Sequence, residues 1–181
     1  MQDTGIVRRI DELGRVVIPK ELRKTLRIRE GDPLEIYTNK DELIFRKYSP
    51  ISTINSYAEA VADGIEEMIE KTCMITDNDS VIYVSGKNKD AIGKIISSEL
   101  EKVLKERKSL VLNKADGSNM VSVIKGDDIG AENQIIVPIV SGSGDCYGSV
   151  LVFDNDKQSR FSSSDVRFIK LGASFLSKQF D

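Results

Sequence analysis

The sequence has no histidine, and its two cysteines, Cys73 and Cys146, lie far apart. Histidine is the commonest general base near neutral pH and the commonest metal ligand, so its absence argues against many hydrolytic and metal-dependent enzymes. Two cysteines without a CxxC pair cannot supply the four ligands of a structural zinc site. We therefore expect no catalytic residues, no metal and no required cofactor, although carboxylates and lysines remain as a route to catalysis.

Long apolar runs are also missing. No run approaches the roughly 18 residues that span a bilayer. The first residues, MQDTGIVRRIDELGR, have neither an apolar core nor a small-residue cleavage site, so we expect no signal peptide. With 40% apolar and 30% charged residues, the composition is typical of a globular protein. We expect a cytoplasmic protein without a membrane partner.

The charge is divided unevenly along the chain. Residues 1–29 carry eight basic side chains against four acidic ones, whereas residues 51–181 carry fifteen against twenty. A basic end on a chain of net charge −3 is expected if only that end meets a polyanion. A solvated surface, with Glu12, Glu21 or Glu30 pairing with nearby arginines, explains the charge equally well. Charge alone therefore leaves both interpretations open.

The first fifty residues predict a hairpin, a short helix and a second hairpin. Gly14 suits the first turn, and Pro19 suits the first turn of a helix. The predicted elements are strands at 4–10 and 15–18, a helix at 20–26, and strands at 34–38 and 43–48. A segment of this size rarely buries enough apolar surface to fold alone. We expect two copies to pool their apolar side chains in a dimer, the alternative being a subdomain packed against the rest of the chain.

The remainder predicts an α+β domain at 56–181, joined by a linker at 51–55 to the first domain at 1–50. Residues 54–69 have the apolar spacing of an amphipathic helix, which could pair with a second copy or lie on its own sheet. The other predicted elements are strands at 73–76, 81–84, 110–112, 120–124, 135–140 and 149–153, and helices at 90–96, 98–107 and 164–178.

Six basic side chains of the first domain are the candidates for contact with DNA. Arg8 and Arg15 lie on the two strands of the first predicted hairpin, where they could approach each other across the turn. Guanidinium groups bridge phosphate oxygens and reach guanine edges. A dimer would double these cations about its two-fold axis. The candidates are Arg8, Arg9, Arg15, Lys20, Arg23 and Lys24.

The strings TGIVRRIDELGRVVIPKELRKTL and EGDPLEIYTNKDELIFRKYSP resemble the N-terminal domain of the AbrB family of bacterial transition-state regulators. The resemblance implies a β-rich swapped-hairpin dimer that binds double-stranded DNA through arginines. The DNA-contacting positions of the family fall on Arg8, Arg15, Arg23 and Lys24. Lys24 departs from the arginine common at that position, and lysine lacks the planar fork needed for a bidentate contact.

The whole chain is similar to the family members that carry a long second domain. This resemblance implies a GAF-like C-terminal domain and dimer contacts at both ends, hence a homotetramer. It also implies a regulator of sporulation genes, associated with the nucleoid of the forespore, which activates or represses transcription. A ligand of the GAF-like domain stays unidentified. The alternatives are an antitoxin of the MazE type, which usually ends in a short toxin-wrapping tail, and a metabolite-sensing regulator.

Overall fold

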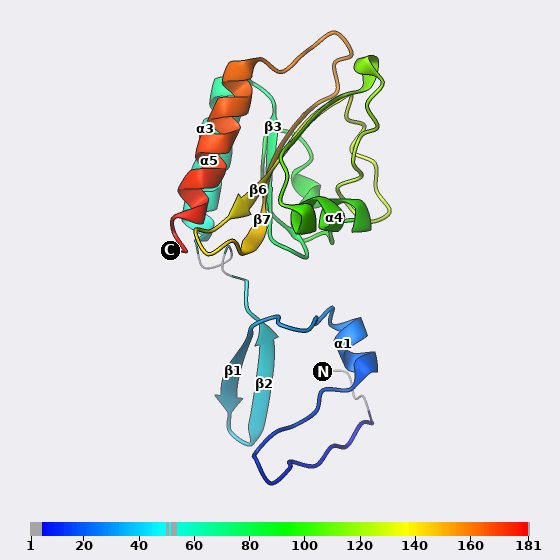
Figure 1. Ribbon diagram of the computed structural model, residues 1–181, viewed down its shortest axis with the longest axis vertical. Coiled ribbons are helices and arrows are strands. Elements are labelled where there is room, and N and C mark those ends of the chain that lie inside the picture. Colours follow the sequence, from blue (N-terminus) through cyan, green and yellow to red (C-terminus); the bar gives the residue numbers. More distant parts are fainter. Residues whose placement is uncertain (1–4, 50, 52–53, 181) are drawn as a thin grey trace. The chain divides into compact units, whose positions relative to one another are not determined.

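The computed structural model of the chain describes residues 5–49, 51 and 54–180. They belong to two compact units, Met1–Tyr48 and Ser49–Asp181, and each unit is described by itself (Figure 1).

The described residues of the N-terminal unit form one short helix and one β-hairpin. Helix α1 spans Lys20–Thr25 and follows Pro19 directly. Strands β1 (Leu34–Asn39) and β2 (Glu42–Lys47) pair antiparallel around a two-residue turn. The predictions of a helix near 20–26 and of a second hairpin are therefore confirmed.

The first predicted hairpin does not form its strands in the single chain. Described residues 5–18 contain no strand, and Thr4 lies outside the described residues. The turn itself is present, because Gly14 N donates to Asp11 O at 3.0 Å and Gly14 has a φ of +74°. An isolated two-stranded hairpin is marginal in water. Here the strands also lack packing partners, since Val7 and Val17 are 84% and 72% exposed.

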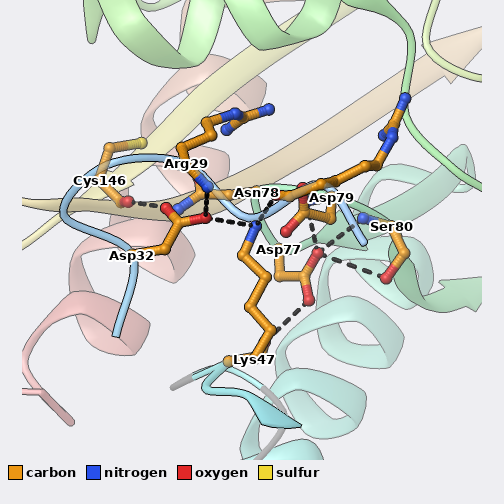
Figure 2. Close-up of polar contacts among 10 residues, drawn as sticks. Arg29, Asp32, Lys47, Asp77, Asn78, Asp79, Ser80 and Cys146 are labelled. Atoms are coloured by element: carbon orange, nitrogen blue, oxygen red, sulfur yellow. Dashed lines mark hydrogen bonds and ion pairs between the residues drawn. The ribbon is translucent and has the colours of Figure 1, made fainter. Parts of the chain in front are cut away.

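Polar contacts hold the N-terminal unit together (Figure 2). The Lys47 ammonium lies 3.0 Å from the Asp32 carboxylate and donates to Arg27 O at 3.1 Å. Asp32 also accepts a hydrogen bond from Arg29 N at 2.8 Å. Apart from Pro19, no described aliphatic or aromatic side chain of this unit is buried. The segment before β1 is thus tied to the end of β2 without an apolar core.

The C-terminal unit is built on a five-stranded antiparallel sheet with the order β4-β3-β7-β6-β5. Its strands are β3 (Thr72–Thr76), β4 (Val81–Ser85), β5 (Leu110–Asn113), β6 (Asn133–Val140) and β7 (Cys146–Asp154). Its helices are α3 (Asn55–Ile69), α4 (Ser98–Glu106) and α5 (Ser163–Ser177), with short 3-10 turns η1 (Lys89–Ala91) and η2 (Lys114–Asp116). In Figure 1, α3 and α5 lie on one face of the sheet and α4 on the other.

Side chains alternate along the strands between two apolar cores. On β7, Val150 and Val152 belong to the core beneath α3 and α5. Their neighbours Leu151 and Phe153 belong to the core on the α4 side. Alternation of this kind follows from the two-residue period of a strand. It explains why β6 and β7 are apolar at most positions, since each face of these strands packs against one of the two cores.

Helices α3 and α5 approach each other closely at Gly172. A Cβ atom at this position would lie 2.9 Å from side-chain carbons of both Val61 and Ile65. The start of α5 is fixed by a capping box, in which Ser162 and Asp165 each accept a hydrogen bond from the other's backbone N–H. The predicted closing helix and the predicted helix at 54–69 are confirmed, and the latter lies on its own sheet.

Two predicted elements of this unit are wrong. Residues 90–96 form no α-helix, because the 3-10 turn η1 ends before Gly93, which has a φ of +80°. Residues 120–124 form no strand of the sheet. The buried Gln134 side chain binds the backbone of Val121 instead, accepting from its N–H at 3.0 Å and donating to its carbonyl at 3.1 Å. The conformation of these two segments is set by a glycine at positive φ and by the hydrogen bonds of the Gln134 side chain. The spacing of apolar residues in the sequence indicates neither of them.

Candidate nucleic-acid interface

Three of the six candidate cations lie together on α1. Lys20, Arg23 and Lys24 are all exposed, and Arg23 and Lys24 occupy the last turn of the helix. Residues three and four apart are neighbours on a helix surface. Because Lys20 is followed at these spacings by Arg23 and Lys24, the three charges form one basic surface. Cations in the last turn also interact favourably with the helix dipole.

Arg15 is held by a carboxylate of the preceding turn. Its Nε donates to Asp11 Oδ2 at 2.8 Å, and its backbone N–H donates to Asp11 Oδ1 at 2.8 Å. Asp11 also accepts from Leu13 N at 3.0 Å. The hydrogen bonds from the Arg15 backbone and side chain lower the pKa of the Asp11 carboxyl below its ordinary value. Asp11 thus orients the Arg15 side chain as the chain leaves the turn.

The sequence analysis assigned no role to Asp11. It named Glu12, Glu21 and Glu30 as local partners, but in the described part of the chain none of them forms an ion pair with the six candidates. The available signal was the position of an aspartate at the start of a turn, where its carboxylate can accept hydrogen bonds from residues further along the turn.

Arg8 and Arg9 are exposed, and Arg8 Nη1 makes a 3.3 Å hydrogen bond to Val7 O. The predicted approach of Arg8 to Arg15 across a hairpin is not formed in the single chain, because residues 5–10 and 15–18 make no strand ladder. The structure therefore brings together Lys20, Arg23 and Lys24 but not the arginines of the first hairpin.

The described residues were also searched for metal sites, membrane-spanning helices and reactive cysteines. They contain no group of three or more histidine, cysteine or acidic side chains placed to hold a metal ion. No described helix is long and apolar enough to cross a membrane. Cys73 is buried in the core, and burial raises the pKa of its thiol well above its ordinary value. Cys146 is partly buried, and both cysteines are free thiols.

Similarity to known proteins covers both units. The family described as stage V sporulation protein T C-terminal, transcription factor, matches residues 53–181. Stage V sporulation protein T of Bacillus subtilis is 42% identical over 183 residues, covering 100% of this chain and 99% of the relative. The chain belongs to the stage V sporulation protein T family.

The N-terminal unit of this family member is AbrB-like. The transition state regulatory protein AbrB of Bacillus subtilis is 52% identical over 66 residues, which cover 36% of this chain and 69% of AbrB. Residues 7–52 also match the family described as antidote-toxin recognition MazE, bacterial antitoxin.

The C-terminal unit has the GAF fold. A GAF domain from an Acinetobacter phosphoenolpyruvate-protein phosphotransferase matches 74% of this chain and 93% of its own length, with a TM-score of 0.54 and 15% identity. This likeness bears on the fold alone. The predicted pairing of an AbrB-like unit with a GAF-like α+β unit is therefore confirmed, as is membership of a family of sporulation transcription regulators.

Proposed function

We propose that the chain regulates sporulation genes of the forespore by binding double-stranded DNA through a dimer of its N-terminal unit. The observation that carries this proposal is the exposed basic surface of α1 in a unit that buries no described aliphatic or aromatic side chain other than Pro19. Arg8, Arg9, Arg15, Lys20, Arg23 and Lys24 are the proposed contacts. Exposed cations suit phosphate binding because each one that neutralises a phosphate releases a condensed counterion from the DNA.

The absence of strands from described residues 5–18 supports dimerisation of the N-terminal unit. Val7, Leu13 and Val17 are more than two-thirds exposed, an unusual situation for apolar residues in a segment of β-branched character. In a swapped-hairpin dimer, residues 5–10 and 15–18 gain strand partners from the second copy. The same exchange places Arg15 and its symmetry mate on one face of the assembly.

An apolar stripe on α5 supports a second contact between copies. Phe168, Leu171 and Phe175 are spaced along one side of the helix and are exposed. Tyr57 of α3 packs edge-on against Phe175, with ring centroids 5.9 Å apart, and extends the surface. We propose that this stripe joins two N-terminal dimers into a homotetramer, which activates or represses genes according to the operator.

We propose no catalytic role for either unit, and we propose that the protein acts in the cytoplasm of the forespore. An antitoxin is the second candidate, favoured by the match of residues 7–52 to the MazE family. A folded C-terminal unit of the GAF type argues against it, since such antitoxins wrap their toxins with a short tail. Co-purification with a toxin from the native host distinguishes the two functions.

The first test is the Arg15→Ala variant in a gel-shift titration against promoter fragments of sporulation genes. We expect the Kd for DNA to rise at least tenfold, because each of the two protomers of the proposed dimer loses a charge-assisted contact worth on the order of 1–3 kcal/mol. Arg167→Ala removes an exposed arginine of α5 and serves as the matched control, with no change expected. Circular dichroism checks that both variants are folded.

Salt dependence supplies a second readout from the same titration. Neutralised phosphates release counterions, so the logarithm of the affinity falls linearly with the logarithm of salt concentration. Arg15→Ala should reduce this slope by about one for each phosphate that the arginine neutralises in the unaltered protein. An unchanged Kd and slope in the folded Arg15→Ala protein would remove Arg15 from the DNA-binding surface.

A further inference from the structure

The chain passes from the first unit to the second at Tyr48 and Ser49, and both residues are held. The Tyr48 backbone N–H donates to Pro33 O at 3.0 Å inside the N-terminal unit. The Ser49 hydroxyl donates to Asp77 Oδ2 at 2.8 Å inside the C-terminal unit. Two consecutive residues are therefore hydrogen-bonded within different units. A single peptide bond separates an anchor of one unit from an anchor of the other.

The Asp77 carboxylate that accepts from Ser49 is part of a tight turn between β3 and β4. The residue is 9% exposed, and its Oδ1 accepts hydrogen bonds at 2.7 Å from the backbone N–H groups of Asp79 and Ser80 (Figure 2). Such bonds are typical of an aspartate at the start of a turn, and here they use one carboxylate oxygen. The other oxygen, Oδ2, is therefore left for the Ser49 hydroxyl. Hydrogen bonds to a charged acceptor are stronger than those between neutral groups.

The turn that carries Asp77 is itself tied to the sheet. The Asp77 backbone N–H donates to Ser80 O at 3.0 Å, which closes the turn. The side-chain amide of Asn78 donates to Cys146 O at 2.8 Å, at the first residue of β7. Strand β3, which leads into the turn, pairs with both β4 and β7. The acceptor for Ser49 is therefore fixed to the sheet of the C-terminal unit.

A second anchor of the C-terminal unit follows shortly after Ser49. Ile51 is fully buried and belongs to the core beneath α3 and α5. If the Ser49 hydrogen bond opens, the connecting chain is released as far as Ile51, which the core continues to hold. An extended chain spans at most about 3.3–3.6 Å per residue, so release of two residues lengthens the connection by roughly 7 Å. The Ser49 contact is therefore the difference between a short connection and a longer one.

We infer that the Ser49 hydroxyl acts as a latch, which fixes the point where the connecting chain leaves the C-terminal unit. With the latch closed, movement between the units is confined to the backbone torsions next to the Tyr48–Ser49 peptide bond. Because Pro50 follows in the sequence, Ser49 is further restricted to extended conformations. With the latch open, the chain from Ser49 to Ile51 becomes a short tether. The boundary between the units is therefore a hinge whose length depends on one hydrogen bond.

The latch has a consequence for DNA recognition that rests on the proposed tetramer. Two N-terminal dimers of one assembly bind two DNA sites together only when their connections span the distance between the sites. A closed latch restricts that distance, whereas the extra length of an open latch, roughly 7 Å, corresponds to about two base pairs at 3.4 Å each. The latch thus sets how strictly the spacing of two sites is read. Binding to a single site does not depend on it, since Ser49 is not among the proposed DNA contacts.

The first test measures the latch in the full-length protein without DNA. Ser49→Thr keeps the hydroxyl, and Ser49→Val has nearly the same shape without it. The NMR order parameter of the backbone amide at position 49 should be about 0.85 in the unaltered protein and in Ser49→Thr, as in rigid backbone, and below about 0.6 in Ser49→Val. Ser56→Ala removes an exposed hydroxyl of α3 and should leave position 49 unchanged. If the branched side chains disturb the site, Ser49→Ala against the unaltered protein gives the same comparison. An amide at position 49 that stays equally ordered without the hydroxyl would overturn the inference.

A series of DNA fragments separates the latch from the proposed function. Each fragment carries two sites, the distance between them increases in steps of one base pair, and gel shift measures the affinity. The range of spacings that bind tightly should widen by about two to four base pairs in Ser49→Val and stay unchanged in Ser49→Thr. A fragment with one site should bind all three proteins equally. Failure of the unaltered protein to bind the single site would refute the DNA-binding proposal, whereas equal single-site binding with identical spacing profiles would refute the role of the latch in DNA recognition.

Discussion

The two units of this chain differ in how far they bury their apolar side chains. The C-terminal unit buries apolar side chains on both faces of its sheet, beneath α3 and α5 on one side and α4 on the other. The N-terminal unit leaves almost all of its apolar side chains accessible and relies on contacts such as Lys47 with Asp32. The C-terminal unit has what it needs to fold as a single chain. The described residues of the N-terminal unit form no apolar core, which is why we propose that a second copy completes it.

Charge follows the same division. The N-terminal unit carries its excess cations on exposed positions of α1 and the first turn, whereas the C-terminal unit is acidic overall. Exposed cations suit a surface that meets a polyanion. The exposed apolar stripe of α5 suits the proposed contact between copies. In both units, the incompletely buried surfaces are the ones for which we propose a partner, either DNA or a second chain.

The largest expected effect contrasts two glycines, one in each unit. A Cβ at Gly148 would lie 1.9 Å from Thr76 O on the neighbouring strand, whereas a Cβ at Gly14 meets nothing within 4 Å. We expect Gly148→Ala to lower the free energy of unfolding by about 3 kcal/mol, because strand β7 must move away from β3. Gly14→Ala should cost about 1 kcal/mol, from its positive φ alone. Urea unfolding followed by circular dichroism measures both, and equal losses would contradict the contrast.

The next effect separates the two proposed contacts between copies. Val17→Asp places a charge on the exposed hairpin of the N-terminal unit, and Leu171→Asp places one on the α5 stripe. Each variant should halve the mass of the assembly measured by sedimentation velocity, from a tetramer to a dimer, because each breaks one of the two proposed dimer contacts. Only Val17→Asp should weaken DNA binding tenfold or more, about 1.4 kcal/mol, since it removes the dimer that presents the arginines. Loss of DNA binding in both variants, or in neither, would show that the contacts are wrongly assigned.

The smallest effect concerns the turn that holds Arg15. In Arg15→Ala the side-chain hydrogen bond to Asp11 is removed, while the backbone bond, the larger cause of the lowered pKa, remains. NMR titration should therefore show the Asp11 pKa rising part of the way toward its ordinary value of 3.8. Asp90, whose pKa is lowered by Lys94, is the internal control and should not change.

The sign of the accompanying stability change follows from the direction of that pKa. Because folding lowers the pKa of Asp11, its contribution to stability is complete above the ordinary value and is lost as the pH falls through the lowered one. The turn should therefore loosen only in acid, and at a higher pH in Arg15→Ala than in the unaltered protein. If the Asp11 pKa is identical in Arg15→Ala and in the unaltered protein, the Arg15–Asp11 contact does not stabilise the turn.

Sequence reasoning reached the fold where a segment is governed by its own periodicity. The α3 and α5 stripes, the run of β6 and the Pro19 start of α1 are all local signals, and each element lies where it was predicted. Reasoning failed where a distant group decides the outcome. The Gln134 side chain holds residues near Val121 off the sheet, and described residues 5–18 form no strand in the single chain although their spacing predicts two.

The candidate site shows the same limit. The cations themselves are visible in the sequence, and the family motif points to four of them. Their grouping on α1 follows from helical spacing, but the partner of Arg15 does not, because Glu12 lies even closer to it in sequence than Asp11 does. A small pocket lined by residues of β5, η2, β6 and the loop before α5 is not visible in the sequence either, since its groups lie far apart along the chain.

The crossing of α3 and α5 at Gly172 has a mechanical consequence. With Val61 and Ile65 in contact at that point, the two helices have no spare layer of side chains between them that could deform. Sliding of one helix along the other would require the interlocked carbons to separate first. If the proposed contact between copies forms on the outer stripe of α5, we therefore expect a displacement of that stripe to move α3 together with α5.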